Sequence, residues 1–555
     1  MRTPFRLLFR HFFLRFLDNE LLSPGAEIQK TLVQIIALLA SLGLVTSLGV
    51  AGAQFRLQGM PYEVRRVGAW TGQELFLSFT ITAVGLMTVF LWDVLFPDRR
   101  DCMILSALPL PSRTIFAAKT ASMLAVLGLL VLALNLFAGL LIPMTLAPPG
   151  SGFFGLLRSY LGWWTATALA GVFMFFALLG LQGALIQLLG HSRYRRVSGH
   201  VQLLTFFLVL AGFFLFPAVA KPKLLASDSL LPFVLPWVWF LGLQQALMGV
   251  GDPLFHKLAL RAVAGLAAAS AVVAITYAAG YARHVRRVIE QADLTSERFS
   301  VPLISLSGAM ARLMKRPVER SLFRFITRTI ARSRQHRLVV ALYGGVGLAY
   351  VFDNLERARM SGPEGLAPPL ILVFFTLVGL RAAFSLPMEL GANWIFRLTE
   401  RDDPIEYVAA VHEALLVLGV APVCALSFFV YTPLLGWWQA LRFVVFLFLV
   451  GLVMIEILLA RFEKIPFTCS YLPGKANLKV MFGVYWTVFM VASFFVTNLA
   501  YTTLRSLPHF VAATGIMAGA AWFGSRRRRR RFRFVFLERQ KPPFLVLDLA
   551  APPEQ

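Results

Sequence analysis

Six charged or titratable residues lie inside long apolar stretches of this 555-residue sequence, and they are the first candidates for chemistry. They are Asp93, Arg381, Glu406, His412, Glu413 and Glu456. A charge inside a bilayer-length apolar segment is costly, so it is commonly paired or lines a path for ions or substrate. We predict that Arg381 pairs with Glu413 or Glu456, and we favour structural pairing over proton transport. Asp93 and Glu406 fall near the ends of their stretches, where we expect them to reach lipid headgroups.

Two hydrolase-like motifs begin in the sequence but are not completed. His412 and Glu413 open an H-E-x-x-H pattern, yet Leu416 stands where the second histidine is required. Two zinc ligands therefore cannot share one helix face there. Ser198 lies in a near match to the intramembrane protease pattern G-x-S-G, with Arg196 in place of the first glycine. The sequence predicts neither a metal centre nor a serine nucleophile.

Nucleotide-binding and glycosyltransferase motifs are also incomplete. Gly474 and Lys475 are followed by alanine, and no G-x-x-x-x-G-K-[ST] pattern occurs in the sequence. Asp402 and Asp403 could suggest a metal-binding glycosyltransferase loop, but Arg401 precedes them and a solvated ion pair is the favoured interpretation. We therefore expect no catalytic residues and no cofactor in this chain.

Composition indicates a protein that folds in lipid. The chain is 58% hydrophobic and 15% charged, with a mean hydropathy of +0.71, whereas soluble domains average about 45–50% apolar and about 25% charged. The net charge of +25 is typical of cytoplasmic loops that meet anionic lipid, and we disfavour nucleic acid as a partner. Three scattered cysteines, Cys102, Cys424 and Cys469, are too few for a disulfide framework.

Twelve apolar runs are long enough to cross a hydrocarbon core of about 30 Å. We predict an all-α fold, a polytopic transmembrane helical bundle of about twelve spans in two six-helix halves. The runs lie near 31–53, 74–96, 117–146, 159–190, 201–220, 257–281, 337–353, 367–387, 405–433, 438–460, 478–500 and 507–524.

Positive charge gathers on alternate loops, which predicts the orientation. With both termini in the cytoplasm, the loops on that side carry most of the Lys and Arg residues that fall between spans. These include Arg99, Arg100, Arg193, Arg195, Arg196, Arg397, Arg401, Arg461, Lys464, Lys475, many residues of 282–336, and the run Arg526, Arg527, Arg528, Arg529, Arg530 and Arg531. We expect that last run to bind anionic headgroups, at about 1 kcal/mol per cation. Docking of a partner protein is the alternative role for that run.

Five regions follow from this pattern. Each half opens with a segment in which arginines four residues apart alternate with Phe, Leu and Ile, as in Arg2, Arg6 and Arg10. We predict that such a helix lies in the membrane interface, the alternative being a cytoplasmic helix packed on another domain. The predicted regions are an interfacial helix in 1–30, a first six-span unit over 31–281, a basic linker with an amphipathic helix over 282–336, a second six-span unit over 337–524, and a basic tail over 525–555.

The segment 96–119, which reads FPDRRDCMILSALPLPSRTIFAAK, is the most informative in the chain. Its prolines predict a short charged helix, a rigid turn and then a new span. The sequence resembles bacterial type-2 ABC exporter permeases, whose loop between spans two and three contacts a separate ATPase. PFVLPWVWFLGLQQAL (232–247) resembles the re-entrant segment that such permeases place before their last span, and the basic amphipathic N-terminal segment resembles their connecting helix. The second half, with LPMELGANWIFRLTERDDPIEYVAAV (386–411), is similar only in layout.

The resemblance implies a permease subunit in the bacterial inner membrane that couples an ABC ATPase, carried on another chain, to export. It implies ATPase-coupling residues in the two loops: Asp98, Arg99, Arg100, Asp101, Pro109, Arg113, Arg397, Arg401, Asp402 and Asp403. The alternatives are an ion-coupled secondary transporter that uses Arg381, Glu413 and Glu456, and a membrane-embedded lipid or glycan enzyme. The sequence does not identify the transported substrate.

Overall fold

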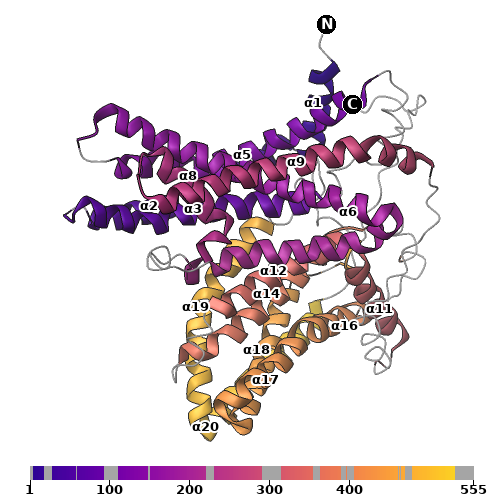
Figure 1. The fold of residues 1–555 in the computed structure, drawn as a ribbon. Helices are drawn as coiled ribbons and strands as arrows, with labels where there is room; N and C mark the ends of the chain where they lie inside the picture. Colours follow the sequence, from indigo (N-terminus) through magenta and orange to yellow (C-terminus); the bar gives the residue numbers. More distant parts are fainter. Residues whose placement is uncertain are drawn as a thin grey trace, which may run out of the picture. The chain divides into compact units, whose positions relative to one another are not determined.

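The computed structural model divides the chain into two compact units, Met1–Glu297 and Arg298–Gln555, and each is described by itself. The residues described are 4–17, 28–57, 59–92, 110–147, 150–219, 231–290, 314, 316–353, 363–388, 396, 405–460, 462, 464–468 and 478–531, some of them by backbone alone. Within these ranges every regular secondary-structure element is a helix, as predicted (Figure 1).

The first unit is built from long helices. Its elements in chain order are α1 (Pro4–Leu17), α2 (Ile28–Arg56), α3 (Tyr62–Phe90), α5 (Ser112–Leu146), α6 (Gly152–Val219), the 3-10 turn η1 (Leu231–Phe233), α8 (Pro236–Leu247) and α9 (Pro253–Glu290). Prolines at 111 and 236 stand at the starts of α5 and α8, where a missing backbone N–H costs nothing. The helix α8 falls in the segment predicted to be re-entrant.

Helix α6 runs without a break over 68 residues, through two predicted spans and the basic segment between them. A straight helix of that length would extend about 100 Å, roughly three times the hydrocarbon core. The helix is instead bent, because Trp92, two residues after the end of α3, contacts two distant positions of α6. Gln182 donates to the carbonyl oxygen of Trp92 at 2.8 Å, and the Trp92 indole donates to Ser198 at 3.0 Å. Those two α6 residues would lie about 24 Å apart on a straight helix.

Helix α1 packs along the start of α5. Leu8 and Phe12 are buried in one apolar cluster with Ile115 and Ala118, and the ammonium group of Lys119 lies 5.6 Å from the Phe12 ring centre. Other apolar side chains of α1, such as Leu7, remain exposed. The helix therefore has both a protein-facing side and apolar surface left for lipid.

The described part of the second unit also begins with a basic amphipathic helix. Its elements are α11 (Pro317–Arg332), α12 (Arg334–Asp353), the 3-10 turn η2 (Pro363–Leu366), α14 (Ala367–Ala383), α16 (Ile405–Leu415), the π-helical η4 (Leu416–Val420), α17 (Ala421–Leu435), α18 (Trp437–Leu459), α19 (Leu478–Arg505) and α20 (Leu507–Arg531). The predicted span 405–433 thus contains a π-helical turn, and the last helix continues through the arginine run.

Helix α11 packs its apolar face on helices of its own unit. Phe323 and Ile326 are fully buried in one cluster with Ala410 and Ala414 of α16. Where α11 meets α12, the hydroxyl of Ser333 and the Nδ1 atom of His336 lie 2.6 Å apart. Nε2 of His336 donates to the Leu386 carbonyl oxygen at 3.2 Å, since that oxygen can only accept. This contact ties the first turn of α12, directly after the amphipathic helix, to the residues just after α14.

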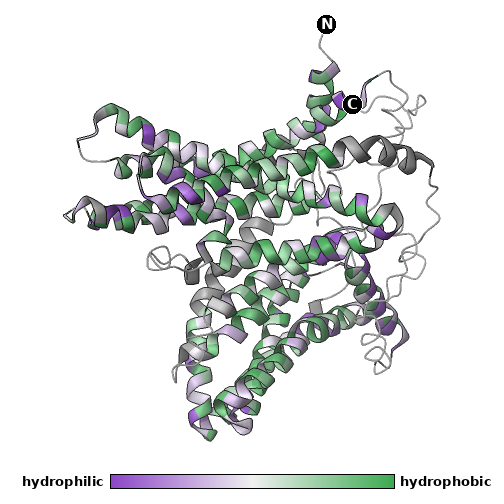
Figure 2. Cartoon of the chain, viewed as in Figure 1, coloured by the Kyte–Doolittle hydropathy of each residue, from purple (hydrophilic) through white to green (hydrophobic). Residues whose placement is uncertain are grey.

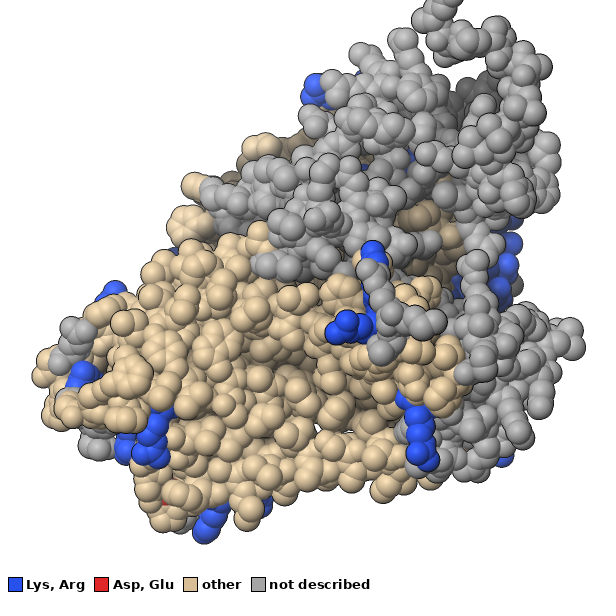
Figure 3. Space-filling view, turned by 90° about the horizontal axis from the view of Figure 1, so that it is seen from above, with Lys and Arg blue, Asp and Glu red and all other residues tan. Residues whose placement is uncertain are grey.

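Seven helices in the described part of the chain are long and apolar enough to cross a membrane, so the chain is an all-helical, multi-pass membrane protein. They are Val64–Phe90, Arg113–Leu146, Gly152–Leu189, Val197–Phe214, Pro253–Thr276, Glu406–Leu435 and Trp437–Leu459. Ala367–Ala383 is apolar but shorter. Because these spans are counted over the described residues alone, the prediction of twelve spans in two halves is not confirmed. Hydrophobic residues run along the helix surfaces (Figure 2). On the face drawn in Figure 3, the described Lys and Arg residues lie as scattered patches on a mostly uncharged surface.

Candidate functional site

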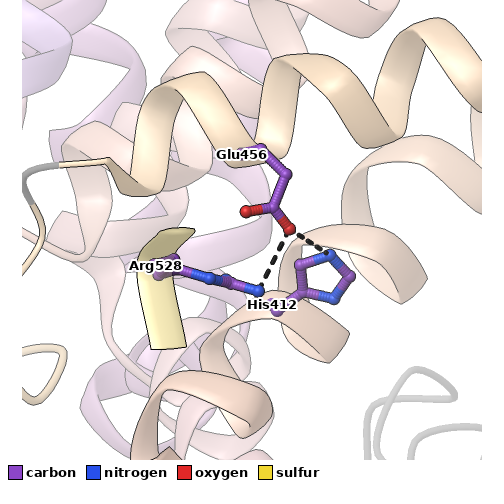
Figure 4. Close-up of polar contacts among 3 residues, drawn as sticks. All are labelled: His412, Glu456 and Arg528. Carbon is purple, nitrogen blue, oxygen red and sulfur yellow. Dashed lines mark hydrogen bonds and ion pairs between the residues drawn. The ribbon is translucent and has the colours of Figure 1, made fainter. Parts of the chain in front are cut away.

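The second unit contains a buried cluster of three polar side chains from three helices. His412 comes from α16, Glu456 from α18 and Arg528 from α20 (Figure 4). Oε1 of Glu456 lies 3.0 Å from Nη2 of Arg528 and 3.4 Å from Nε2 of His412. The exposed fraction is 8% for the Glu456 side chain, 11% for Arg528 and 18% for His412. A carboxylate so far from water requires such partners.

Close helix packing brings these groups together. Gly524 lies one turn before Arg528 on the same face of α20. A Cβ atom added to Gly524 would come within 3.0 Å of Cβ of Glu456. The missing side chain lets α20 approach α18 closely enough for the Arg528 guanidinium to reach the carboxylate, as small residues do at membrane helix interfaces.

The π-helical turn η4 follows His412 by one turn. Insertions of this kind interrupt regular α-helical bonding and are frequent at functional sites. Val420, the last residue of η4, packs on Gly451 of α18, where an added Cβ would lie 2.7 Å from Cγ1 of Val420. The irregular turn therefore fits against the helix that carries Glu456.

One acceptor of the cluster is unused. Among the described residues, Oε2 of Glu456 is buried and has no hydrogen-bond partner. A buried acceptor in this state costs about 1–3 kcal/mol unless water or a proton satisfies it. Chemically, the cluster combines a carboxylate, an imidazole and a fixed cation, which is a set of groups that can hold and exchange a proton.

The predicted pairing of Arg381 is wrong. Its guanidinium group donates to the Ser385 hydroxyl at 2.7 Å and to the Leu458 carbonyl oxygen at 3.4 Å, and stacks 4.3 Å from the ring centre of Phe462. Glu456 instead contacts His412 and Arg528. Backbone, hydroxyl and aromatic partners thus surround this cation, which the sequence could not distinguish from pairing with an acid.

Glu413 lies in a second charged group where α11 meets α16. Arg316 is 4.0 Å from Glu406. The pKa of Glu319 is raised above its ordinary value by burial first and then by the charge of Glu413. Three carboxylates and at least one arginine therefore meet at this junction, and Glu406 contacts a protein side chain rather than lipid alone.

The arginine run after the last span divides by helical position. Arg528 points inward to Glu456, so its predicted role as a headgroup-binding residue is wrong. Arg526 and Arg527 are exposed, and Arg526 stacks 3.8 Å from the Trp522 ring centre. The side chains of Arg529, Arg530 and Arg531 are outside the description. The sequence does not distinguish Arg528 from its neighbours in the run, because its partner depends on the packing of α20 against α18.

Arg113 is the one predicted coupling residue that the structure describes, and it is exposed in the first turn of α5, next to the contact with α1. The other predicted coupling residues lie outside the described ranges: Asp98, Arg99, Arg100, Asp101, Pro109, Arg397, Arg401, Asp402 and Asp403. Asp93, predicted as a charge near the end of a span, also lies outside them.

Metal ligands do not converge in the described part of the chain, where no three His, Cys, Asp or Glu side chains gather to hold an ion. Cys424 is a free, buried thiol in α17. Comparison with protein-family models, with curated proteins and with solved structures returned no match.

Proposed function

We propose that this chain is the membrane permease subunit of an ATP-driven exporter of the ABC type, with ATP hydrolysis on a separate chain. One observation carries the proposal. In each unit a basic amphipathic helix packs against the helix that follows the charged, proline-containing loop: α1 against α5, and α11 against α16. Two coupled permease units would each need such a pair of packed helices to transmit movement of the loop.

This arrangement offers a route for force. A partner that pushes on the loop before α5 acts at Arg113, which lies in the first turn of α5, and Ile115 and Ala118 in the next part of α5 contact Leu8 and Phe12 of α1. Packed helices move as stiff bodies because their interiors are close-packed. In the second unit, Glu406 in the first turn of α16 meets Arg316 just before α11. Loop displacement would thus move an amphipathic helix and a spanning helix together.

The proposal includes a location and an orientation. The chain resides in the bacterial inner membrane with both termini cytoplasmic, and the exposed arginines at the end of α20 bind anionic headgroups. Support comes from the unequal distribution of Lys and Arg between alternate loops and from the exposure of Arg526 and Arg527.

Photocrosslinking tests the coupling proposal. A photoreactive amino acid in place of Arg113 is expected to capture a nucleotide-binding chain in native membranes. The same replacement at Arg56, exposed at the end of α2 on the predicted outer side, is the control. Deletion of 98–113 is expected to abolish co-purification of that chain. The proposal is rejected if no nucleotide-binding chain co-purifies with the intact protein.

A second candidate function is ion-coupled transport, and the His412–Glu456–Arg528 cluster favours it. The vacant Oε2 acceptor of Glu456 is the specific observation, since a proton could occupy it. Purified protein in liposomes with a pH-sensitive dye tests this candidate. Proton flux without ATP that is lost in Glu456→Gln would support it, and absence of flux above that of empty liposomes would reject it.

A further inference from the structure

One end of the first unit contains a cavity of about 170 Å³. A single water needs only about 10–15 Å³ of such space, so a small polyatomic ligand fits. The wall comes from the start of α3, the end of α5 and the turn between α8 and α9. Thr145 lines the cavity from the end of α5, and Gly249 and Gly251 line it from the turn between α8 and α9. The site is thus formed by the helix that resembles a re-entrant segment and two of its neighbours.

Positive charge surrounds this cavity. Arg65 and Arg66, both half-buried, line it. The guanidinium group of Arg158 lies against Gly249, within 3.0 Å of where a Cβ would be. No Asp or Glu occurs among the described residues that line the wall. Asp252, just beyond it, accepts from the backbone N–H of Leu254 at 2.9 Å and so caps the start of α9.

Two buried amides lie in the same wall with unused hydrogen-bonding capacity. Gln73 and Gln245 are each 1% exposed, and Nε2 of Gln245 donates to Oε1 of Gln73 at 2.5 Å. In the described part of the chain, Nε2 of Gln73 and Oε1 of Gln245 have no partner. Reversing both amides leaves the same result, with one donor and one acceptor unused. An unmet buried donor destabilises the folded protein, and a bound acceptor would satisfy it.

We propose that this cavity binds a phosphate-class oxyanion. Arginine guanidinium groups match phosphate oxygens in a bidentate fork. Two cations in the wall and a third at Gly249 favour a phosphate group, whose several oxygens can accept from more than one guanidinium group, over a single carboxylate. The Gln73 amide supplies a neutral donor. The anion is either the headgroup of a phospholipid or free phosphate. The exposed rings of Phe153 and Phe154, about one turn before Arg158, provide apolar surface for acyl chains in the first case.

The site goes beyond the proposed function and does not depend on ATP coupling. The test uses the full chain purified in a neutral detergent. Inorganic phosphate is titrated calorimetrically at constant ionic strength, because screening alone weakens exposed charges. The wild-type protein is expected to bind saturably, and Arg65→Gln/Arg66→Gln is expected to weaken binding at least tenfold. Arg56→Gln, which removes one exposed cation outside the cavity wall, is expected to leave affinity unchanged.

Native mass spectrometry distinguishes the two sources. Retention of phosphatidylglycerol by the wild-type protein but not by the double variant identifies a lipid headgroup, and binding of inorganic phosphate without retained lipid identifies the free anion. Should the double variant not fold, Arg158→Gln alters only an exposed side chain and is expected to weaken binding about threefold. The proposal is overturned if the wild-type protein binds neither ligand, or if the folded variants bind like the wild-type protein.

Discussion

Replacing Arg528 with methionine tests the central contact of the second unit. The change keeps a long, flexible, apolar side chain in place but removes the cation that lies 3.0 Å from Glu456. The carboxylate, 8% exposed, is then left with His412 as its partner among the described residues. We expect the folded state to lose stability because a buried charge has lost its strongest partner.

The expected loss is about 2–3 kcal/mol. Breaking a buried pair by removing one member commonly costs about 3–5 kcal/mol. His412 lowers the figure here, since it stays 3.4 Å from the carboxylate.

A double-mutant cycle isolates the pair. Arg528→Met, Glu456→Met and the double variant are compared by reversible unfolding in detergent micelles. The double variant removes both charges and is expected to cost only about 0–1 kcal/mol, less than either single change. Arg527→Met is the matched control, because that arginine is its exposed neighbour, and it is expected to change stability by no more than about 0.5 kcal/mol.

Two outcomes would refute this reasoning. Equal losses for Arg527→Met and Arg528→Met would mean that the run acts as a general cationic patch and not through one inward side chain. Strict additivity in the double variant would mean that Glu456 and Arg528 do not interact in the folded protein.

Three further predictions concern other contacts. Gly524→Ala is expected to lower stability by about 1–2 kcal/mol, because its methyl group would press on Glu456, whereas Gly515→Ala, with nothing within 4 Å, is expected to raise it by up to about 1 kcal/mol in unfolding titrations. Ser198→Ala is expected to cost about 1 kcal/mol, and it should add nothing in a Trp92→Phe background if their hydrogen bond is the cause. Glu319→Gln is expected to stabilise the protein at pH 7, because burial and Glu413 raise the pKa of that carboxyl in the folded state. A raised folded pKa lowers stability as pH rises, so the gain should vanish below about pH 4.5, as measured by unfolding at both pH values.

Helix positions were predictable because apolar length leaves the chain little choice in lipid. The run 438–460 became α18 (Trp437–Leu459), and 117–146 became α5 with its start five residues earlier, at Ser112. The amphipathic segments formed helices at Pro4–Leu17 and Pro317–Arg332. Each of these results follows from local pattern alone.

Features that depend on distant partners were not predictable in the same way. The polar stretch between 190 and 201 predicted a loop, yet the chain stays helical there, with Ser198 and Gln182 bonded to the end of α3. The π-helical turn η4 has no pattern of its own. The charged residues inside apolar stretches can be identified from the sequence, but their partners depend on helix packing. Glu456 contacts Arg528 and His412, and Arg381 stacks on the ring of Phe462.

The two units share a beginning but differ in polar content, and this difference constrains any mechanism. Both place an amphipathic helix against the helix after a charged loop. Within the described residues, the cavity with Arg65 and Arg66 belongs to the first unit, and the buried cluster around Glu456 belongs to the second. Two units with the same function would be expected to contain the same polar groups, because a buried ion pair and an open cationic cavity each cost stability. On the proposals made above, the first unit would bind a ligand in its cavity and the second would be stabilised by its buried charge pair, so the two units would not have identical roles.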